Sequence, residues 1–161
     1  MATYMPGHIT IGGPLAKRLL RRLAKAVVAE TVSADWGNEP LDLPACLTLV
    51  REAHENQEPV VFYHELARYG RFENLEAICR KLGLTYVVHS DAGDEWDAGY
   101  GWWQPGMDEP GECAATNGGE VLITIGDVRQ ALEAEQPLAA VTDLLARAQP
   151  PDVPPLTLVP A

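Results

Sequence analysis

The residues best suited to metal binding or nucleophilic catalysis in this chain are its four histidines and three cysteines. They are His8, His54, His64, His89, Cys46, Cys79 and Cys113. No two of them stand at the close spacings that structural zinc sites and zinc hydrolases use, and the GxSxG nucleophile motif is absent. The sequence therefore predicts no metal, no cofactor and no catalytic residue.

One enzymatic alternative stays open. Glu65 follows His64 directly, and Asp91 lies two residues after His89. Imidazole groups beside carboxylates can perform general acid–base chemistry. An enzyme that combines His64, Glu65 and His89 in a dispersed site is therefore the second alternative to a binding function.

Charge is distributed unevenly along the chain. Twelve Lys and Arg residues stand against 23 Asp and Glu residues, which gives a net charge of −11. Residues 82–128 contain no Lys or Arg, whereas residues 91–112 hold three of the four tryptophans. Nucleic-acid backbones repel a protein of this charge unless its positive charge is concentrated. Direct nucleic-acid binding is therefore not expected.

The acidic segment with its tryptophans is the predicted partner-binding surface. Tryptophan among carboxylates suits a protein-binding hot spot that steers a basic partner, and spread carboxylates can also imitate phosphates. On a strand, Trp102 and Trp103 point to opposite faces, so one is expected in the core and the other partly exposed. The predicted binding residues are Asp91, Asp94, Glu95, Trp96, Asp97, Trp102, Trp103, Asp108 and Glu109. The competing interpretation is that the tryptophans pack inside and the acids only solubilise the chain.

A basic helix offers the first alternative surface. Its five cations fall within nine residues: Lys17, Arg18, Arg21, Arg22 and Lys25. They line one side of an amphipathic pattern over residues 15–29, opposite an apolar stripe. This concentration of charge indicates a nucleic-acid-associated regulatory module as the alternative function.

Length and composition place the chain among soluble globular proteins. Its 161 residues are 47% apolar, which suits one domain, expected over residues 1–148. No apolar run approaches the roughly 20 residues of a membrane span, and the first residues lack the pattern of a secretory signal. Three widely spaced cysteines argue against a disulfide framework and favour the cytoplasm. The oligomeric state is left open.

The pattern of apolar residues, Gly and Pro predicts the order β-α-α-β-α-β-β-β-α-α. Strands are expected at 8–12, 59–63, 85–89, 99–104 and 121–125. Helices are expected after a turn at 12–14, over 43–56 and 72–82, after a cap at Asp127, and after Pro137. The predicted core includes Leu19, Leu23, Val61, Leu75, Ile78 and Val88. On the first of the last two helices, Val128, Ala131 and Leu132 are expected to face inward.

These elements predict an α+β fold with two layers, in which a mixed or mainly antiparallel sheet carries helices on one face. A split β-α-β core of the ferredoxin-like type is expected for residues 59–104 together with the first strand. Five prolines among the last 13 residues forbid a helix there. Residues 149–161 are therefore expected to be an extended, polyproline-like or disordered tail that contributes little to folding.

Several motifs occur together in a familiar arrangement. They are ITIGGP at 9–14, Trp36-Gly37, the ARYG and LEA segments between 67 and 77, and WQPGM at 103–107. Over residues 8–132 the chain resembles small uncharacterised acidic proteins of phages and other mobile elements. The resemblance implies a setting in which such proteins bind and block host nucleic-acid enzymes, including CRISPR and restriction complexes. We therefore expect a non-enzymatic binding protein of the anti-defence type, with a basic protein or nucleic-acid-binding complex as its partner.

Overall fold

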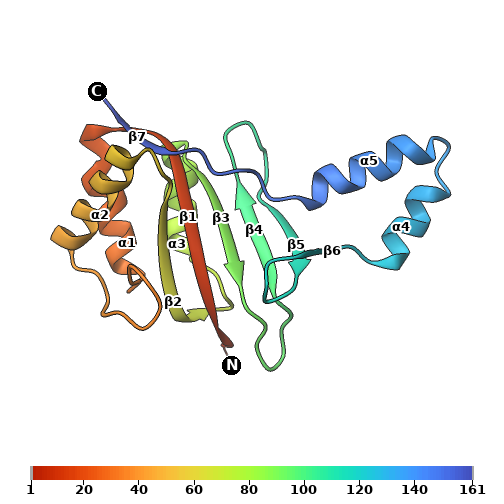
Figure 1. Cartoon of the computed structure of the whole chain (residues 1–161), viewed down its shortest axis with the longest axis horizontal. Coiled ribbons are helices and arrows are strands. Elements are labelled where there is room, and N and C mark those ends of the chain that lie inside the picture. The colour runs from red at the N-terminus through yellow and green to blue at the C-terminus, as the bar shows by residue number, and fades with distance from the viewer. Residues whose placement is uncertain (1, 161) are drawn as a thin grey trace.

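The fold is organised around one long strand, β1, which pairs with three other strands of a seven-stranded sheet. The computed structural model describes residues 2–160 (Figure 1). The strands are β1 Tyr4–Ala16, β2 Val60–Arg68, β3 Thr85–Ser90, β4 Gly99–Trp103, β5 Gly111–Ala115, β6 Val121–Leu122 and β7 Leu156–Val159. Their order is β2-β1-β3-β4-β5-β6, with every neighbouring pair antiparallel, and β7 pairs parallel to β1. The mixed, mainly antiparallel sheet is as predicted.

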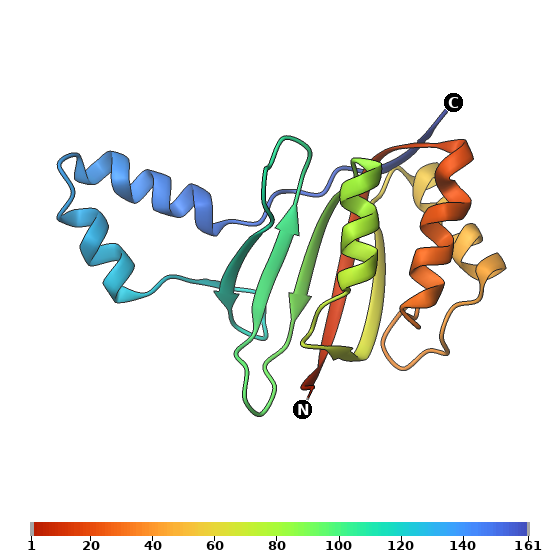
Figure 2. The same cartoon turned by 180° about the vertical axis from the view of Figure 1, so that it is seen from behind.

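Helices cover one face of part of this sheet. They are η1 Lys17–Leu19, α1 Leu20–Ala29, α2 Leu43–Asn56 and α3 Glu73–Leu82. Seen from behind, α1 and α3 lie in front of the sheet on the side of β1, β2 and β3, whereas β4 and β5 carry no helix on this face (Figure 2). Alternate β1 residues, Ile9 and Ile11 among them, point under these helices and are fully buried. The predicted two-layer α+β architecture is confirmed.

The predicted split β-α-β unit is present. Strands β2 and β3 both run antiparallel to β1 and lie on either side of it, and α3 connects them. Helix α3 ends as the sequence indicates, because Gly83 adopts a left-handed φ of 70°. The amide of Leu84 then donates to the Cys79 carbonyl at 2.9 Å, which seals the helix end. Helix α2 also has its predicted bounds and begins with Asp42 accepting a hydrogen bond from the Ala45 amide.

The predicted core is confirmed in part. Leu23, Leu75 and Val88 are buried. Leu19, Val61 and Ile78 are only half-buried. Val61 pairs with Thr10, which places it on the sheet face that α1–α3 do not cover.

The expected turn at residues 12–14 is wrong, because β1 continues through it to Ala16. The tail supplies the partner: the Gly13 amide donates to the Pro155 carbonyl at 3.1 Å. A Cβ on Gly12 would lie 1.7 Å from the carbonyl oxygen of Pro154. Glycine is thus required here for a close approach of two chain segments and does not mark a tight turn.

The tail is extended, as predicted, but the expectation that it contributes little to folding is wrong. It crosses the sheet face opposite α1–α3 and ends as β7 beside β1 (Figure 1). Leu156 is fully buried, and its amide donates to the Glu58 carbonyl at 3.0 Å. The Leu158 amide donates to Nδ1 of His54 at 3.1 Å. The last residues are therefore part of the domain core.

The last two helices do not cover the sheet. Helices α4 Ile125–Leu132 and α5 Pro137–Ala148 form an arm, residues 121–148, that projects beyond β5 (Figure 1). The expected strand over 121–125 is only β6, and the cap of α4 is Thr124, whose Oγ1 accepts from the Asp127 amide at 3.1 Å. The inward orientation expected for Val128 and Leu132 is also wrong, since both are exposed.

Candidate functional site

A groove of about 610 Å³ lies where the helical layer ends, over β3, β4 and β5. The floor of the groove has only small side chains or none, because it is formed by Ala98, Gly99 and Gly101. A Cβ on Gly101 would come within 2.7 Å of the Arg71 guanidinium carbon, so the arginine lies directly across β4. The glycine in the middle of this strand therefore makes room for a side chain from the turn before α3.

Two aromatic rings form one rim of the groove. Trp96 comes from the loop between β3 and β4, and Tyr69 comes from the turn after β2. Their ring centroids are 6.0 Å apart in an edge-to-face arrangement. Trp96 is 53% exposed and Tyr69 is 36% exposed. Exposed aromatic faces of this kind can bind cations as well as apolar groups.

The charges of the groove are mostly negative. The cation Arg71 is already engaged, because Nε donates to Oε2 of Glu76 at 3.1 Å and Nη2 pairs with Oε1 of the same buried carboxylate. Carboxylates Asp97 and Glu112 line the groove and are exposed, with Glu112 Oε2 4.0 Å from Arg71 Nη1. Aromatic faces with uncompensated carboxylates can hold a Lys or Arg side chain.

The predicted acids divide into two groups. Asp91, Asp94, Glu95 and Asp97 lie in the loop after β3, whereas Asp108 and Glu109 lie in the loop after β4. Successive antiparallel strands turn at opposite ends of a sheet, so these loops lie at the two ends of β4. Of these six acids only Asp97 lines the groove, and Asp91, Asp94 and Glu95 share its loop.

The three predicted tryptophans also differ in their surroundings. Trp102 is 4% exposed and lies on the face that the tail crosses, close against Gly111. Trp103 points to the helical face, packs against the core and donates from Nε1 to the Met107 carbonyl at 3.0 Å. The expected opposite orientation is confirmed, but Trp96 is the one of the three with an openly exposed ring.

Sequence analysis missed Tyr69 and Arg71, which complete the groove. Both are more than 20 residues from Trp96 along the chain and flank Gly70, which lies in the turn between β2 and α3. A Cβ on Gly70 would lie 2.4 Å from the Ser90 Cβ. This close approach of the two turns positions Tyr69 beside Trp96. The only signal in the sequence was the Tyr-Gly-Arg triplet at the turn.

A second feature that sequence analysis missed is a row of rings on the sheet face opposite α1–α3. His8 pairs with Tyr63 on one side and His89 on the other, with ring centroids 5.7 and 5.4 Å away. The rings of His89 and Tyr100 follow at 4.8 Å. Burial and the neighbouring His89 hold the pKa of His8 below its ordinary value of 6.5, and Asp91 offsets part of this effect.

This lowered pKa predicts a loss of stability in mild acid. Between the pKa of folded His8 and about 6.5, the unfolded chain binds a proton at this residue that the folded chain does not. The free energy of unfolding should therefore fall as the pH decreases through this window. Denaturant titrations between about pH 7 and 5 should show a shallower fall for His8→Gln than for the wild type. Equal slopes would contradict the prediction. Burial raises the pKa of Glu30, so this residue increases the free energy of unfolding as the pH decreases. Its contribution is the same in the wild type and in His8→Gln.

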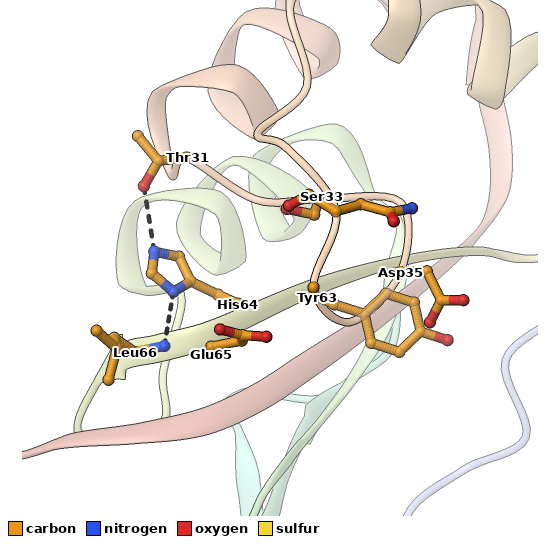
Figure 3. A pocket seen from close by; sticks show the side chains of 9 residues that line it. Thr31, Ser33, Asp35, Tyr63, His64, Glu65 and Leu66 are labelled. Carbon is orange, nitrogen blue, oxygen red and sulfur yellow. Dashed lines mark hydrogen bonds between the residues drawn. The ribbon is translucent and has the colours of Figure 1, made fainter.

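The histidine–carboxylate site that would make the chain an enzyme is not assembled among the described residues. His64 pairs with Gly7 and His89 with His8, so the two side chains leave the sheet on opposite faces. A small cavity of about 190 Å³ contains His64 and Glu65 (Figure 3). There the His64 Nδ1 accepts from the Leu66 amide at 2.9 Å, and Nε2 lies 3.1 Å from the Thr31 hydroxyl. His64 thus positions the end of α1, with both ring nitrogens occupied.

The cysteines are also poorly suited to catalysis. Burial raises the pKa of Cys46 to about 11, and it raises the pKa values of Cys79 and Cys113 as well. All three therefore stay protonated near neutral pH and are weak nucleophiles. Within residues 2–160 there is no group of three or more His, Cys, Asp or Glu side chains that could hold a metal ion.

The alternative basic surface is present as a set of exposed side chains. Lys17 and Arg18 belong to η1, and Arg21, Arg22 and Lys25 belong to α1. All five are exposed, while Leu20, Leu23 and Val27 of the same segment are buried. The predicted amphipathic pattern is confirmed, although the helix begins five residues later than residue 15.

Comparisons with protein-family models, with curated proteins and with solved structures gave no match for this chain. No helix among residues 2–160 has both the length and the apolar character needed to cross a bilayer.

Proposed function

We propose that this protein is a non-enzymatic binding module whose groove beside Trp96 takes a basic segment of a partner protein. The observation that carries the proposal is the pairing of two exposed rings, Trp96 and Tyr69, with the exposed carboxylates Asp97 and Glu112 around one groove. A guanidinium or ammonium group can contact a ring face and a carboxylate there at the same time. The internal cation, Arg71, does not oppose this because Glu76 already neutralises it.

The acids of the loop after β3 extend the negative electrostatic field of the groove. Asp94, Glu95 and Asp97 are exposed around Trp96, so their field extends into solvent. Exposed charges of this kind increase the rate of encounter with an oppositely charged partner and add little to the lifetime of the complex. A ring that loses its water on binding contributes mainly to the lifetime. Steering and anchoring are therefore assigned to different residues.

The proposal extends to an anti-defence inhibitor on the basis of the resemblance to mobile-element proteins. A basic nucleic-acid-binding surface of a host enzyme has the charge that the groove requires. The division of the acids between the two ends of β4 supports docking at one local site more than imitation of a continuous row of phosphates. Competition between this protein and DNA for such an enzyme tests the extension.

The division of roles predicts two separable kinetic effects on binding to an immobilised arginine-rich peptide. Replacing Asp91, Asp94, Glu95 and Asp97 by their amides should slow association roughly tenfold at low salt and weaken its salt dependence. Replacing Trp96 by Ala should leave association nearly unchanged and accelerate dissociation by about 30-fold, which corresponds to about 2 kcal/mol. Surface plasmon resonance measures both rates.

A matched variant controls for the loss of total charge. Replacing Asp108, Glu109, Glu133 and Glu135 by their amides removes the same number of charges from exposed positions outside the loop after β3. The association rate of this variant should stay within about twofold of wild type. Equal slowing by both variants would show that net charge, and no particular site, attracts the peptide. Stronger binding to DNA than to the peptide would favour the basic surface of η1 and α1.

A further inference from the structure

The α4–α5 arm exposes large apolar side chains more densely than the rest of the chain: among the described residues, six of the eleven exposed large hydrophobic side chains lie in residues 121–148. Along α4, Ile125 is 72% and Leu132 is 57% exposed. Along α5, Leu138 is 82% and Leu145 is 47% exposed. Of the residues in these two helices only Ala131, where the helices meet, is buried. The arm thus places large aliphatic side chains in water on both of its helices.

The spacing of these side chains is that of a helix-packing seam. Ile125, Val128 and Leu132 follow one another at intervals of three and four residues, so they share one side of α4. Leu138 and Leu145 are seven residues apart and share one side of α5. Half-buried Val141 and Leu144 contribute to the inner side of α5. Each helix therefore presents an apolar stripe to solvent, and Ala131 is the one residue of α4 that is buried.

The arm cannot fold back to cover its outer stripes. At one end β6 is paired with β5, and at the other end residues 149–152 line a cavity together with Trp102 on the face that the tail crosses. Both connections hold the arm away from the sheet (Figures 1 and 2). Helices of 8 and 12 residues are also marginal in water without packing on both sides. The stripes therefore need cover from another molecule.

The net charge of the arm indicates which kind of molecule covers its apolar stripes. The arm carries four acids and two bases, a net charge of −2, whereas the whole chain carries −11. A basic partner is attracted more strongly to the acidic loop after β3 than to this nearly neutral surface. A second, equally weakly charged arm meets little repulsion and offers matching stripes. A second copy of the arm would supply the other two helices of a four-helix bundle.

We propose that the outer stripes of α4 and α5 pack against the same arm of a second copy of this chain, so that two arms form a four-helix bundle. The interface is isologous, with the arm of each copy contacting that of the other about a two-fold axis. The dimer carries two Trp96 grooves, one on each body, so a partner with two basic segments binds with avidity. Dimer formation itself does not depend on the groove or its ligand.

Sedimentation equilibrium of the full chain tests this proposal. The wild type should be dimeric at micromolar concentrations, and Leu132→Gln/Leu138→Gln should weaken dimerisation at least 100-fold. Both side chains are exposed in the single chain, so the substitutions should leave its fold intact. The matched control Tyr4→Gln/Leu66→Gln removes two apolar side chains that are 57% and 65% exposed on β1 and β2, and it should dimerise like wild type.

Amide hydrogen exchange provides a readout without any substitution. In α4 and α5, protection should increase with protein concentration, whereas protection in α1 and α3 should not change. A wild type that stays monomeric at about 200 μM would overturn the proposal. So would equal weakening by the control variant, or concentration-independent exchange in the arm.

Discussion

Replacing Leu156 by Ala is expected to lower the free energy of unfolding by about 2–5 kcal/mol, although the residue lies only five positions before Ala161, the last residue of the sequence. The side chain is fully buried within the main core cluster. Its backbone links the tail to two elements, because its amide donates to Glu58 and its strand pairs with Gly13–Ala16 of β1. Truncation leaves a cavity between β7, β1 and α2.

Urea denaturation measures this loss, with Leu66→Ala as the matched control. Leu66 is 65% exposed on β2, so the same truncation there should cost less than about 0.5 kcal/mol. Deleting residues 150–161 should destabilise the protein at least as much as Leu156→Ala, since it removes β7 entirely. If Leu156→Ala costs no more than the control, the tail is not part of the core.

The second large effect is expected at the internal ion pair. Glu76 is 2% exposed, and its carboxylate is held by Arg71 and by the Phe72 amide, which donates at 2.9 Å. Arg71→Met removes the guanidinium group and leaves the Glu76 carboxylate as an uncompensated charge in the protein interior. Removing one partner of a buried pair costs about 3–5 kcal/mol. The measured quantity is again the free energy of unfolding.

An exposed pair of the same chemical type provides the control. Arg147 and Asp143 form an ion pair on α5 with 69% and 66% of their side chains exposed. Arg147→Met should therefore cost no more than about 0.5 kcal/mol. The double variant Arg71→Met/Glu76→Met should recover part of the loss, because no isolated charge remains buried. A loss for Arg71→Met as small as that for Arg147→Met would show that Glu76 is hydrated.

The elements that the sequence predicts well are those with local signals. Helix α2 begins at the residue before Pro44, and α3 ends where Gly83 takes a left-handed conformation. The hairpin of β3 and β4 follows from two aromatic and β-branched runs around a polar loop. In these segments the apolar periodicity, the helix-capping residues and the glycines or prolines that end an element lie within a few residues of one another. Local propensity and tertiary packing then favour the same structure.

The misjudged segments depend on contacts between residues distant in sequence. The strand through Gly12 and Gly13 exists because residues 154–156 lie against it, more than 140 positions later. The inward face expected for Val128 assumed that every amphipathic helix covers its own sheet. The arm breaks that assumption, since both its ends are fixed away from the sheet. An apolar stripe indicates that a helix needs cover, but it does not identify what supplies it.

Only part of the candidate site could be predicted from the sequence. Trp96 and Asp97 were identified from composition, because a tryptophan within an acidic loop is unusual for a purely solvated segment. The partners Tyr69 and Arg71 come from another turn, and Asp108 was wrongly grouped with the site because its distance along the chain is short. The antiparallel course of β4 separates these acids, whereas packing of Gly70 against Ser90 joins the two turns.

The most direct test of the groove follows the four tryptophan indole N–H signals by nuclear magnetic resonance during titration with an arginine-rich peptide at low salt. Trp96 is the one tryptophan that lines the groove, while Trp102 and Trp103 are buried or packed and Trp36 lies beside Tyr63. We expect the Trp96 signal to shift in a saturable way that high salt suppresses, with the other three nearly unchanged. A Trp96 signal that stays fixed at saturating peptide, or a larger shift at Trp36, would contradict the assignment of this groove as the binding site.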